Sequence, residues 1–344
     1  MKALQYDHHG GPEVLTYVDV AEPYTSPADV LVEVAATALN HLDIVQRNGW
    51  FTMPGYSLPH IAGMDVVGTV IAAGDEVDGV RVGDRVVVDP SLAGVSDNSR
   101  LAGMGDLYGE LGVIGGTVAG GYAERCLAPG SHVHRIPDSM SWEHAVVFPS
   151  AWMTAHHAIF AVGHLQFGET ILIHAAGSGV SSAAIQLAKH AGATVLATAG
   201  SEDKCERALA LGADHVANNR DTDITAWARS VTEGAGVDIV FDHVGPALWA
   251  QSMFALKPRG RLVNCGNTTG DTATIPSLGF MFHMGIQILG SDPYRYEEFG
   301  SAWHTYCHGG FESAIDSVFP LAEGAAAQQK MERSDFFGKI LLKP

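Results

Sequence analysis

The chain has 344 residues, of which 47% are hydrophobic and 17% charged, so its composition is that of a well-packed globular protein. This length exceeds what one typical core accommodates, and we expect two domains. The formal net charge of −18, from 38 acidic and 20 basic residues, disfavours a nucleic-acid partner or an anionic membrane surface.

The amino terminus gives no sign of a targeting segment. Residues 1–9 lack the apolar core of a signal peptide, and the chain has no run of about 18 consecutive apolar residues. We therefore expect a soluble, cytoplasmic protein with no membrane partner.

The cysteines and histidines do not predict a metal site or a disulfide framework. Cys126, Cys205, Cys265 and Cys307 are widely separated, which is typical of small buried side chains. Neighbouring histidines such as His156 and His157 point in different directions on a helix or strand, whereas a metal needs converging ligands. We interpret most of the 17 histidines as surface or core residues.

Residues 1 to about 150 predict a β-rich domain. Short valine-rich runs occur at 30–35, 66–71 and 85–88, and turn residues separate them. This spacing indicates an antiparallel, barrel-like sheet. Residues 40–47 predict a short helix, and the glycine-rich residues 91–121 predict a long loop or lobe.

From Trp152 onward, helix and strand patterns alternate. We expect strands at 170–175, 194–199, 214–217, 237–244, 261–266 and 286–290, with helices at 202–211, 224–231 and 247–256. The alternation predicts a doubly wound parallel sheet. The tail carries another strand at 339–342, which we expect to return to the first domain. The expected domains are residues 1–151 with 292–344, and residues 152–291.

The most informative stretch is a βαβ unit at residues 170–204. Its first strand leads into the glycine-rich turn Gly177, Ser178, Gly179, Val180 and Ser181, and the helix after the turn ends at Gly192. Small residues at such a turn let the backbone approach an anion at a helix N-terminus, which predicts a dinucleotide site. Ala176 and Ser181 interrupt the G-x-G-x-x-G pattern, so an ordinary tight turn is the alternative.

The end of the second strand of this unit favours NADPH over NADH. An NAD enzyme of this fold has Asp or Glu there to bond the adenosine ribose, and this chain has Ala199. Gly200 and Ser201 can donate from backbone and hydroxyl, and Lys204 adds a positive charge one helical turn later. Glu202 and Asp203 act against this preference, and a solvated helix position is the alternative for Lys204.

Five motifs occur in a fixed order along the chain. They are Gly83-Asp-Arg-Val86, Gly120-Gly-Tyr-Ala-Glu124, Ala175-Ala-Gly-Ser-Gly-Val180, Leu211-Gly-Ala-Asp214 and Phe337-Gly-Lys-Ile340. Together they resemble the medium-chain dehydrogenase/reductase superfamily over essentially the whole chain. The resemblance implies an α/β protein with a split GroES-like catalytic domain, an inserted Rossmann domain, and hydride transfer in the cleft between them.

The resemblance also implies further cofactor contacts. Thr154 would meet the nicotinamide carboxamide, and Asn219 and Arg220 would lie near the 2′-phosphate. The remaining positions would line the cofactor at strand ends or from the returning tail: His243, Val244, Cys265, Gly266, Asn267, Phe337 and Lys339.

The zinc ligands of the superfamily are not matched. Zinc members have a cysteine in the early helix, a Gly-His-Glu motif and a third ligand before the Rossmann domain, where this chain has Asn40, Gly63-Met64-Asp65 and Ser150. These side chains are not an ordinary Zn²⁺ set. The cysteine-rich lobe that holds a structural zinc would fall near residues 91–116, which contain no cysteine. We therefore expect no metal.

The chain thus resembles the zinc-free branch of the superfamily, the quinone reductases and related enone or enoyl reductases, and Asn40 with Asp43 fits the Asn-x-x-Asp pattern of that branch. The resemblance implies a zinc-independent NADPH reductase of a quinone or an activated C=C bond. A conjugated acceptor needs only hydrogen-bond donors for its developing enolate. Asn40, Asp43 and Asp65 are the candidate catalytic residues. Asn40 could bond the substrate or the nicotinamide ribose, or it could simply cap the helix. Asp43 and Asp65 could organise the cleft, or each could form a structural salt bridge or cap. No proton donor can be assigned.

Two other functions stay open. One is a zinc alcohol dehydrogenase with displaced ligands drawn from His41, His60, Asp65 or His157, and the other is an NADPH-binding protein without catalysis. We also expect a homodimer, with a tetramer as the alternative, because an apolar edge strand at residues 286–290 needs a partner.

Overall fold

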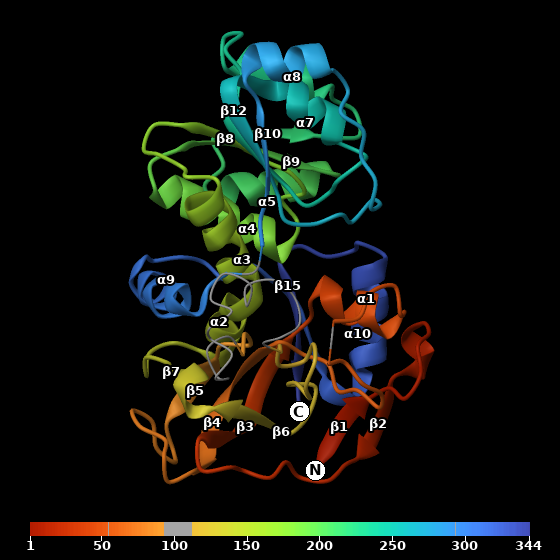
Figure 1. Ribbon diagram of the computed structural model, residues 1–344, viewed down its shortest axis with the longest axis vertical. Helices are drawn as coiled ribbons and strands as arrows, with labels where there is room; N and C mark the ends of the chain where they lie inside the picture. The colour runs from red at the N-terminus through yellow and green to blue at the C-terminus, as the bar shows by residue number, and fades with distance from the viewer. Residues whose placement is uncertain (54, 93–111, 293) are drawn as a thin grey trace. The chain divides into compact units, whose positions relative to one another are not determined.

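The computed structural model describes residues 1–344 except residues 54, 93–111 and 293 (Figure 1). The chain divides into two compact units. The first is Met1–Ser150 with Pro293–Pro344, and the second is Ala151–Asp292. Of the loop expected at 91–121, residues 93–111 lie outside the described residues.

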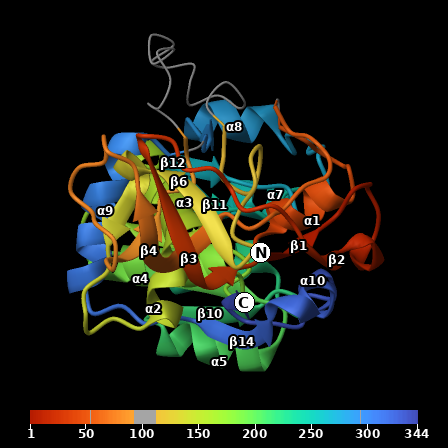
Figure 2. The ribbon, with the colours of Figure 1, turned by 90° about the horizontal axis from the view of Figure 1, so that it is seen from below.

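The first unit is built mainly of antiparallel β-structure. A seven-stranded sheet has the order β14-β15-β3-β4-β5-β7, and β6 pairs with β3 beside it (Figure 1, Figure 2). β1 and β2 form a separate two-stranded sheet. The strands are β1 (Lys2–Gln5), β2 (Thr16–Asp19), β3 (Asp29–Ala38), β4 (Asp65–Ala73), β5 (Arg85–Val88), β6 (Arg125–Pro129), β7 (Val133–Arg135), β14 (Ile315–Pro320) and β15 (Lys339–Lys343).

The long strand β3 organises this unit because both of its edges are paired. β4 pairs with it along nearly its whole length, and β6 and β15 share its other edge. Its alternate valines pack into one core with valines of β4 and β5: Val30, Val32, Val34, Val66, Val70, Val86 and Val88. The helices of the unit are α1 (His41–Arg47), α2 (Trp142–Val146), α9 (Tyr296–His308) and α10 (Gly324–Glu332), with short 3-10 turns at η1 (Pro12–Val14), η3 (Gly130–His132) and η6 (Leu321–Glu323).

The second unit is a six-stranded parallel sheet with the order β10-β9-β8-β11-β12-β13, the doubly wound order of Rossmann folds. Its strands are β8 (Thr170–Ile173), β9 (Thr194–Ala199), β10 (His215–Asn218), β11 (Val237–Asp242), β12 (Leu256–Asn264) and β13 (Gln287–Gly290). Its helices are α3 (Met153–His156), η5 (His157–Val162), α4 (Gly179–His190), α5 (Glu202–Ala210), α6 (Ile224–Val231), α7 (Trp249–Ala255) and α8 (Leu278–Met284). The expected fold class is therefore confirmed.

Among the elements that the sequence predicted, the boundary that differs most is the start of β12. The structure starts this strand at Leu256, five residues before the predicted start at Arg261. Pro258 lacks an N–H, so the sequence here argues against a strand. In the structure Arg259 has a positive φ of 64°, which is irregular for a strand. A register shift in the pairing with β11, between Val237 and Ile239, accommodates the irregularity.

Residues Trp142–Val162 form a helical run of 21 residues, which includes the π-helical stretch η4 (Phe148–Trp152). Its most apolar window has a mean hydropathy of 1.3 and is 67% buried. The run is long and apolar enough to cross a membrane by length and composition, and buried core helices of soluble proteins meet the same criteria. Glu143, Ser150 and Thr154 interrupt its apolar residues, so the run does not appear as a continuous apolar stretch in the sequence.

Candidate functional site

The turn between β8 and α4 carries the dinucleotide motif. Ser178 is the N-cap of α4, and its hydroxyl accepts a hydrogen bond from the Ser181 N–H at 2.9 Å. Ala175 adopts the left-handed conformation with a φ of 52°, and the Ala176 N–H donates to the Thr198 carbonyl of β9 at 2.8 Å. The turn is thereby fixed against the neighbouring strand, with Gly179 and Val180 opening the helix.

Gly177 allows a lysine to lie directly over this turn. A Cβ atom at Gly177 would lie 3.0 Å from Cδ of Lys204 and 3.5 Å from its Nζ. The contact with Cδ is tighter than ordinary packing, so a larger residue at Gly177 would make the lysine side chain shift. The structure therefore places the Lys204 side chain beside the glycine-rich turn, and its contact with a 2′-phosphate stays a prediction.

A second cation lies at the neighbouring strand end. A Cβ atom at Gly200 would be 3.4 Å from Nε of Arg220, so the guanidinium adjoins the residue that follows β9. The N–H of Asn219 donates to the Ala199 carbonyl at 2.8 Å, which ties the end of β10 to the end of β9. Lys204 thus lies beside Gly177, and Arg220 lies beside Gly200, where the sequence predicts the 2′-phosphate contact.

Near the expected 2′-phosphate position, the side chains of Glu202 and Ser201 form hydrogen bonds within the chain. Glu202 accepts a hydrogen bond from the Asn218 side chain at 3.1 Å, which directs its carboxylate toward β10. Ser201 is the N-cap of α5, and its hydroxyl accepts from the Lys204 N–H at 3.4 Å. Because a hydroxyl can accept and donate at once, Ser201 keeps its proton for an anion.

His243, at the end of β11, holds the glycine-rich turn from the other side. Its Nε2 atom lies 2.8 Å from the Ser181 hydroxyl and 3.1 Å from the Ser178 hydroxyl. The Ser181 proton is donated to the His174 carbonyl at 2.6 Å, so in the contact with Ser181 the imidazole nitrogen is the donor. These bonds assign a positioning role to His243, which the sequence placed at the cofactor only through the family resemblance.

His174 is a structural residue that sequence reasoning missed. Its ring bonds the Thr198 hydroxyl and the Ser252 hydroxyl, each at 2.9 Å, and so joins β8, β9 and α7 beneath the turn. Complete burial lowers the pKa of His174 to about 3, which keeps the ring neutral. No spacing rule finds this residue, because its partners lie far away in the sequence.

The ends of β11 and β12 form the next part of the site. The buried carboxylate of Asp242 accepts hydrogen bonds from the N–H groups of Val244 and Gly245, at 2.9 and 3.2 Å, and so shapes the turn after β11. Burial raises the pKa of Asp242. On β12, the Cys265 N–H donates to the Asp242 carbonyl at 2.9 Å. A Cβ atom at Gly266 would lie 3.0 Å from Cβ of His243, so this glycine lets the two strand ends approach.

Three other residues that were predicted to contact the cofactor, Asn267, Thr154 and Phe337, lie on different elements. The Asn267 amide donates to the Asp271 carboxylate at 2.8 Å on the surface. Thr154 is half-buried on α3, which packs against α4 in the second unit. Phe337 belongs to the first unit and is only 2% exposed, just before β15.

The candidate catalytic residues of the first unit form a buried polar cluster around Lys339. Its ammonium group donates to Asp65 at 2.8 Å, to Asn40 Oδ1 at 2.7 Å and to the Leu39 carbonyl at 2.7 Å. The Asn40 amide nitrogen donates back to Asp65 at 3.0 Å. The second oxygen of Asp65 accepts from the Ser150 N–H at 2.8 Å. This cluster of Asn40, Asp65, Ser150 and Lys339 joins four distant parts of the chain.

Asp43 lies beside this cluster and helps to cap α1. Asn40 is the N-cap residue, and its N–H donates to the Asp43 carboxylate at 2.8 Å. The same carboxylate oxygen accepts from the Tyr122 hydroxyl at 2.7 Å. Asp43 is fully buried, and burial raises its pKa to about 6. The structure thus gives Asp43 a capping contact and Asp65 an ion pair, and it commits the Asn40 side chain to the cluster.

The residues at the superfamily's catalytic-zinc positions do not fit a Zn²⁺ ion. Asp65 is the one anionic side chain among them, and the Lys339 ammonium already neutralises it. A second cation beside that ammonium would be repelled. The alternative zinc ligands that the sequence offered do not converge on one point either. His60 bonds the Gly115 carbonyl at 3.0 Å, His157 bonds Asp292 at 3.2 Å, and the described residues contain no group of three converging His, Cys, Asp or Glu side chains.

Comparison with known proteins agrees with this fold. The alcohol dehydrogenase GroES-like domain matches residues 26–138, and the zinc-binding dehydrogenase domain matches residues 179–307. A quinone oxidoreductase of Pseudomonas aeruginosa is 30% identical over 352 residues, with 100% of this chain and 99% of that protein covered.

Two solved structures extend the comparison. A crystal structure of an NAD-dependent alcohol dehydrogenase superposes with a TM-score of 0.93 at 35% identity, over 100% of both chains. The Escherichia coli quinone oxidoreductase complexed with NADPH superposes with a TM-score of 0.84 at 26% identity, also over 100% of both chains.

These findings define the class of protein: a GroES-like domain with an inserted Rossmann-type domain. The chain belongs to the medium-chain dehydrogenase/reductase superfamily, as its motifs predicted, and it is an oxidoreductase similar to quinone oxidoreductases.

Proposed function

We propose that the protein is a zinc-independent, NADPH-dependent oxidoreductase that transfers hydride to a quinone or to an activated C=C bond of the enone or enoyl type. The observation that carries the proposal is the cluster around Lys339. Asn40, at a zinc-ligand position, and Asp65, in the tripeptide that matches Gly-His-Glu, are hydrogen-bonded to one ammonium group, whose charge balances that of the carboxylate.

The cofactor part of the proposal rests on the second unit. Lys204 and Arg220 adjoin the two glycines that flank the expected 2′-phosphate position, and Ala199 offers no carboxylate to repel it. The Escherichia coli relative of known structure is an NADPH complex, which also supports this choice. Bound NADPH would supply the hydride.

The substrate class follows from the chemistry of the acceptor. Without a Lewis acid at the carbonyl oxygen, negative charge that develops during hydride addition has to be delocalised by the substrate itself or stabilised by hydrogen bonds. Quinones and conjugated enones delocalise this charge onto a distant oxygen. An isolated ketone does not. The quinone oxidoreductase of Pseudomonas aeruginosa supports the same class.

The test combines metal analysis with substrate profiling. Protein purified without added zinc is assayed for NADPH oxidation with a panel of quinones, an α,β-unsaturated ketone and an enoyl thioester, with and without a chelator. We expect turnover that the chelator leaves intact, and much less than one zinc per chain. Stoichiometric zinc together with chelator-sensitive activity would contradict the proposal.

A second candidate is an NAD-dependent alcohol dehydrogenase, favoured by the likeness to the structure with a TM-score of 0.93. It predicts NAD⁺-dependent oxidation of a saturated alcohol, which the first proposal does not. A cofactor-binding protein without catalysis predicts saturable NADPH binding with no turnover of any member of the panel.

We further propose that two copies pair through β13. Among the described strands β13 pairs with β12 alone, and Leu278 and Phe282 of the adjacent α8 are 66% and 67% exposed. Paired edge strands would cover this apolar surface. Light scattering should show a dimer or a tetramer, and Ile288→Lys on β13 should lower the measured mass of this assembly. Val318→Lys on β14, which is also an edge strand, is the matched control. A wild-type monomer at micromolar concentration would refute the pairing.

A further inference from the structure

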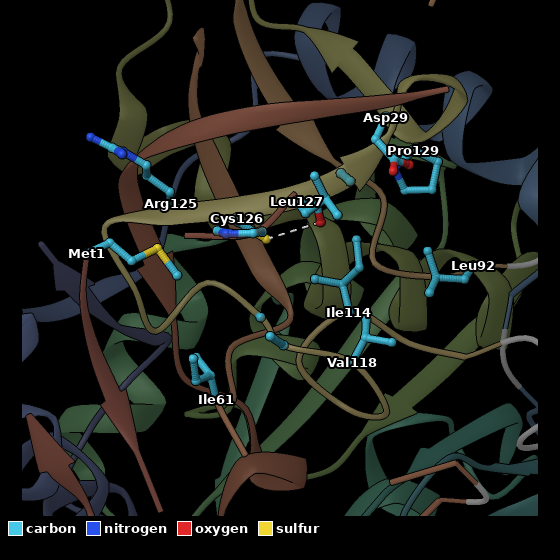
Figure 3. A pocket seen from close by; sticks show the side chains of 14 residues that line it. Met1, Asp29, Ile61, Leu92, Ile114, Val118, Arg125, Cys126, Leu127 and Pro129 are labelled. Carbon is cyan, nitrogen blue, oxygen red and sulfur yellow. Dashed lines mark hydrogen bonds between the residues drawn. The ribbon is translucent and has the colours of Figure 1, made fainter. Parts of the chain in front are cut away.

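The first unit contains a cavity of about 430 Å³ beside strand β6 (Figure 3). Ile114 and Val118 reach toward β6 from the neighbouring loop, and Ile61, Leu92 and Leu127 are further apolar residues of the lining. None of the residues of the Lys339 cluster lines this cavity. Its volume falls within the range of about 300–1,000 Å³ that is typical of small-molecule sites.

The backbone of β6 contributes polar groups to the cavity. Alternate residues of an antiparallel strand turn their N–H and C=O groups toward the partner. The Glu124 carbonyl accepts from the Val34 N–H of β3, and the Gly130 N–H donates to the carbonyl of the residue before β3. Even-numbered residues of this segment therefore face β3, and the N–H and C=O groups of the odd-numbered Leu127 point away from it. Among the described strands β6 pairs with β3 alone. The Leu127 carbonyl accepts from the Cys126 thiol at 3.6 Å (Figure 3). The N–H of Leu127 points to the same side of the strand, the edge that pairs with no described strand.

The charges at the cavity determine which molecules it can take. Arg125 is already paired with Glu22, so its guanidinium is neutralised. The Asp29 carboxylate at the other end would repel an anion. Burial raises the pKa of the Cys126 thiol to about 12, so this group is uncharged as well. Asp29 itself accepts from the Ser26 N–H at 3.3 Å, and the Met1 ammonium donates to the Val20 carbonyl at 3.0 Å. Each charged group of the described lining is thus engaged within the chain, which favours an uncharged ligand.

We propose that this cavity is a second binding site, separate from the cofactor site, for an uncharged ring-sized molecule that carries a carbonyl or hydroxyl oxygen. The apolar side chains would cover the ring, and the oxygen would accept a hydrogen bond from the Leu127 N–H. The site has no part in the function proposed above, so either can fail without the other.

The test uses the full-length protein and the uncharged fluorescent ketone 6-propionyl-2-dimethylaminonaphthalene, whose emission shifts to the blue in apolar surroundings. We expect saturable binding of one molecule per chain. Val118→Trp should fill the mouth of the cavity and weaken this binding by at least about tenfold, which corresponds to about 1.4 kcal/mol. Val118→Asp should weaken it as much by placing a charge beside the ring.

The matched control is Val82→Trp, since Val82 is another exposed valine of the first unit and does not line the cavity. It should bind the ketone like the wild type. Thermal unfolding and NADPH titration check that each variant is folded. Non-saturable binding to the wild type, or equal affinity of Val118→Trp and Val82→Trp, would overturn the proposal.

Discussion

Two lysines show how differently the two units use the same side chain. Lys339 is 5% exposed at its side chain and donates to three acceptors of its own chain. Lys204 is half-buried near the start of α5 and lies over Gly177. An ammonium group that is enclosed by chain acceptors stabilises the fold, whereas Lys204 borders the glycine-rich turn, where we propose that the cofactor binds. Residue type alone does not separate these roles.

The largest effect is expected when the buried ion pair between Lys339 and Asp65 is broken. Lys339→Met leaves the Asp65 carboxylate buried without a counter-charge, and this should lower the free energy of unfolding by about 3–5 kcal/mol. Urea unfolding measures the change. A double variant with Asp65→Asn should recover part of the loss, because it removes the unpaired charge as well.

The matched control is Lys2→Met on the surface. Lys2 pairs with Asp19 at the same 2.8 Å, but these side chains are 41% and 77% exposed. Water screens that pair, so its loss should change stability little. Similar losses for the two lysine variants would show that the Lys339 cluster is not the rigid element inferred here.

The next effect concerns the carboxyl group beside the cluster. The pKa of Asp43 is raised by burial from 3.8 to about 6, so the folded state holds its proton more tightly than the unfolded state. The stability from this group is fully present below the unfolded pKa and is lost as the pH rises through about 6. Asp43→Asn should remove this dependence, which amounts to at most about 3 kcal/mol. Urea unfolding of both proteins at about pH 4.5 and 7.5 checks it, and parallel pH profiles would contradict it.

The cofactor preference should reverse with one substitution at the open site. Ala199→Asp places a carboxylate at the end of β9, where it would bond the ribose hydroxyls of NADH and repel a 2′-phosphate. We expect a change of about 1.5–3 kcal/mol in the difference between the two binding free energies. Ala199 is 1% exposed, so thermal unfolding is measured in parallel. Tighter NADH binding would itself prove a folded variant, and a wild type that already prefers NADH would refute the assignment.

The smallest effect concerns the two cations. Lys204→Ala and Arg220→Ala should each weaken NADPH binding by about 1–2 kcal/mol, as expected for one charge-assisted contact at a partly exposed site. NADH has no phosphate there and should bind as before. Lys189→Ala is the control, because that lysine pairs with Asp214. If Lys204→Ala weakened both cofactors equally, this turn would not be a 2′-phosphate pocket.

The turn could be predicted because its residues are close together in the sequence. A buried strand, small residues and a helix follow one another within residues 170–190, and each step has a local physical reason. Ala199 and Lys204 follow within one more strand and turn. The doubly wound sheet was predictable for the same reason, since strand and helix periods alternate visibly along the chain.

The Lys339 cluster could not be derived from spacing. Its members stand at positions 40, 65, 150 and 339, and only the return of β15 to β3 brings the lysine to the carboxylate. The role of His174 was hidden for a similar reason, because its partners Thr198 and Ser252 lie on other elements. The start of β12 was missed because Pro258 and Arg259 do not resemble strand residues.

The return of β15 also bears on the order in which the chain can fold during synthesis. The second unit is one continuous segment and is complete once residue 292 has left the ribosome. Until β15 and Lys339 have been made, the first unit lacks one of the three strands that pair with β3 and the counter-ion of Asp65. Domains usually fold as they are made, from the amino terminus onward. Here the unit that begins first would finish last, so the end of the β3 edge at Thr37 and Ala38 stays unpaired until β15 arrives.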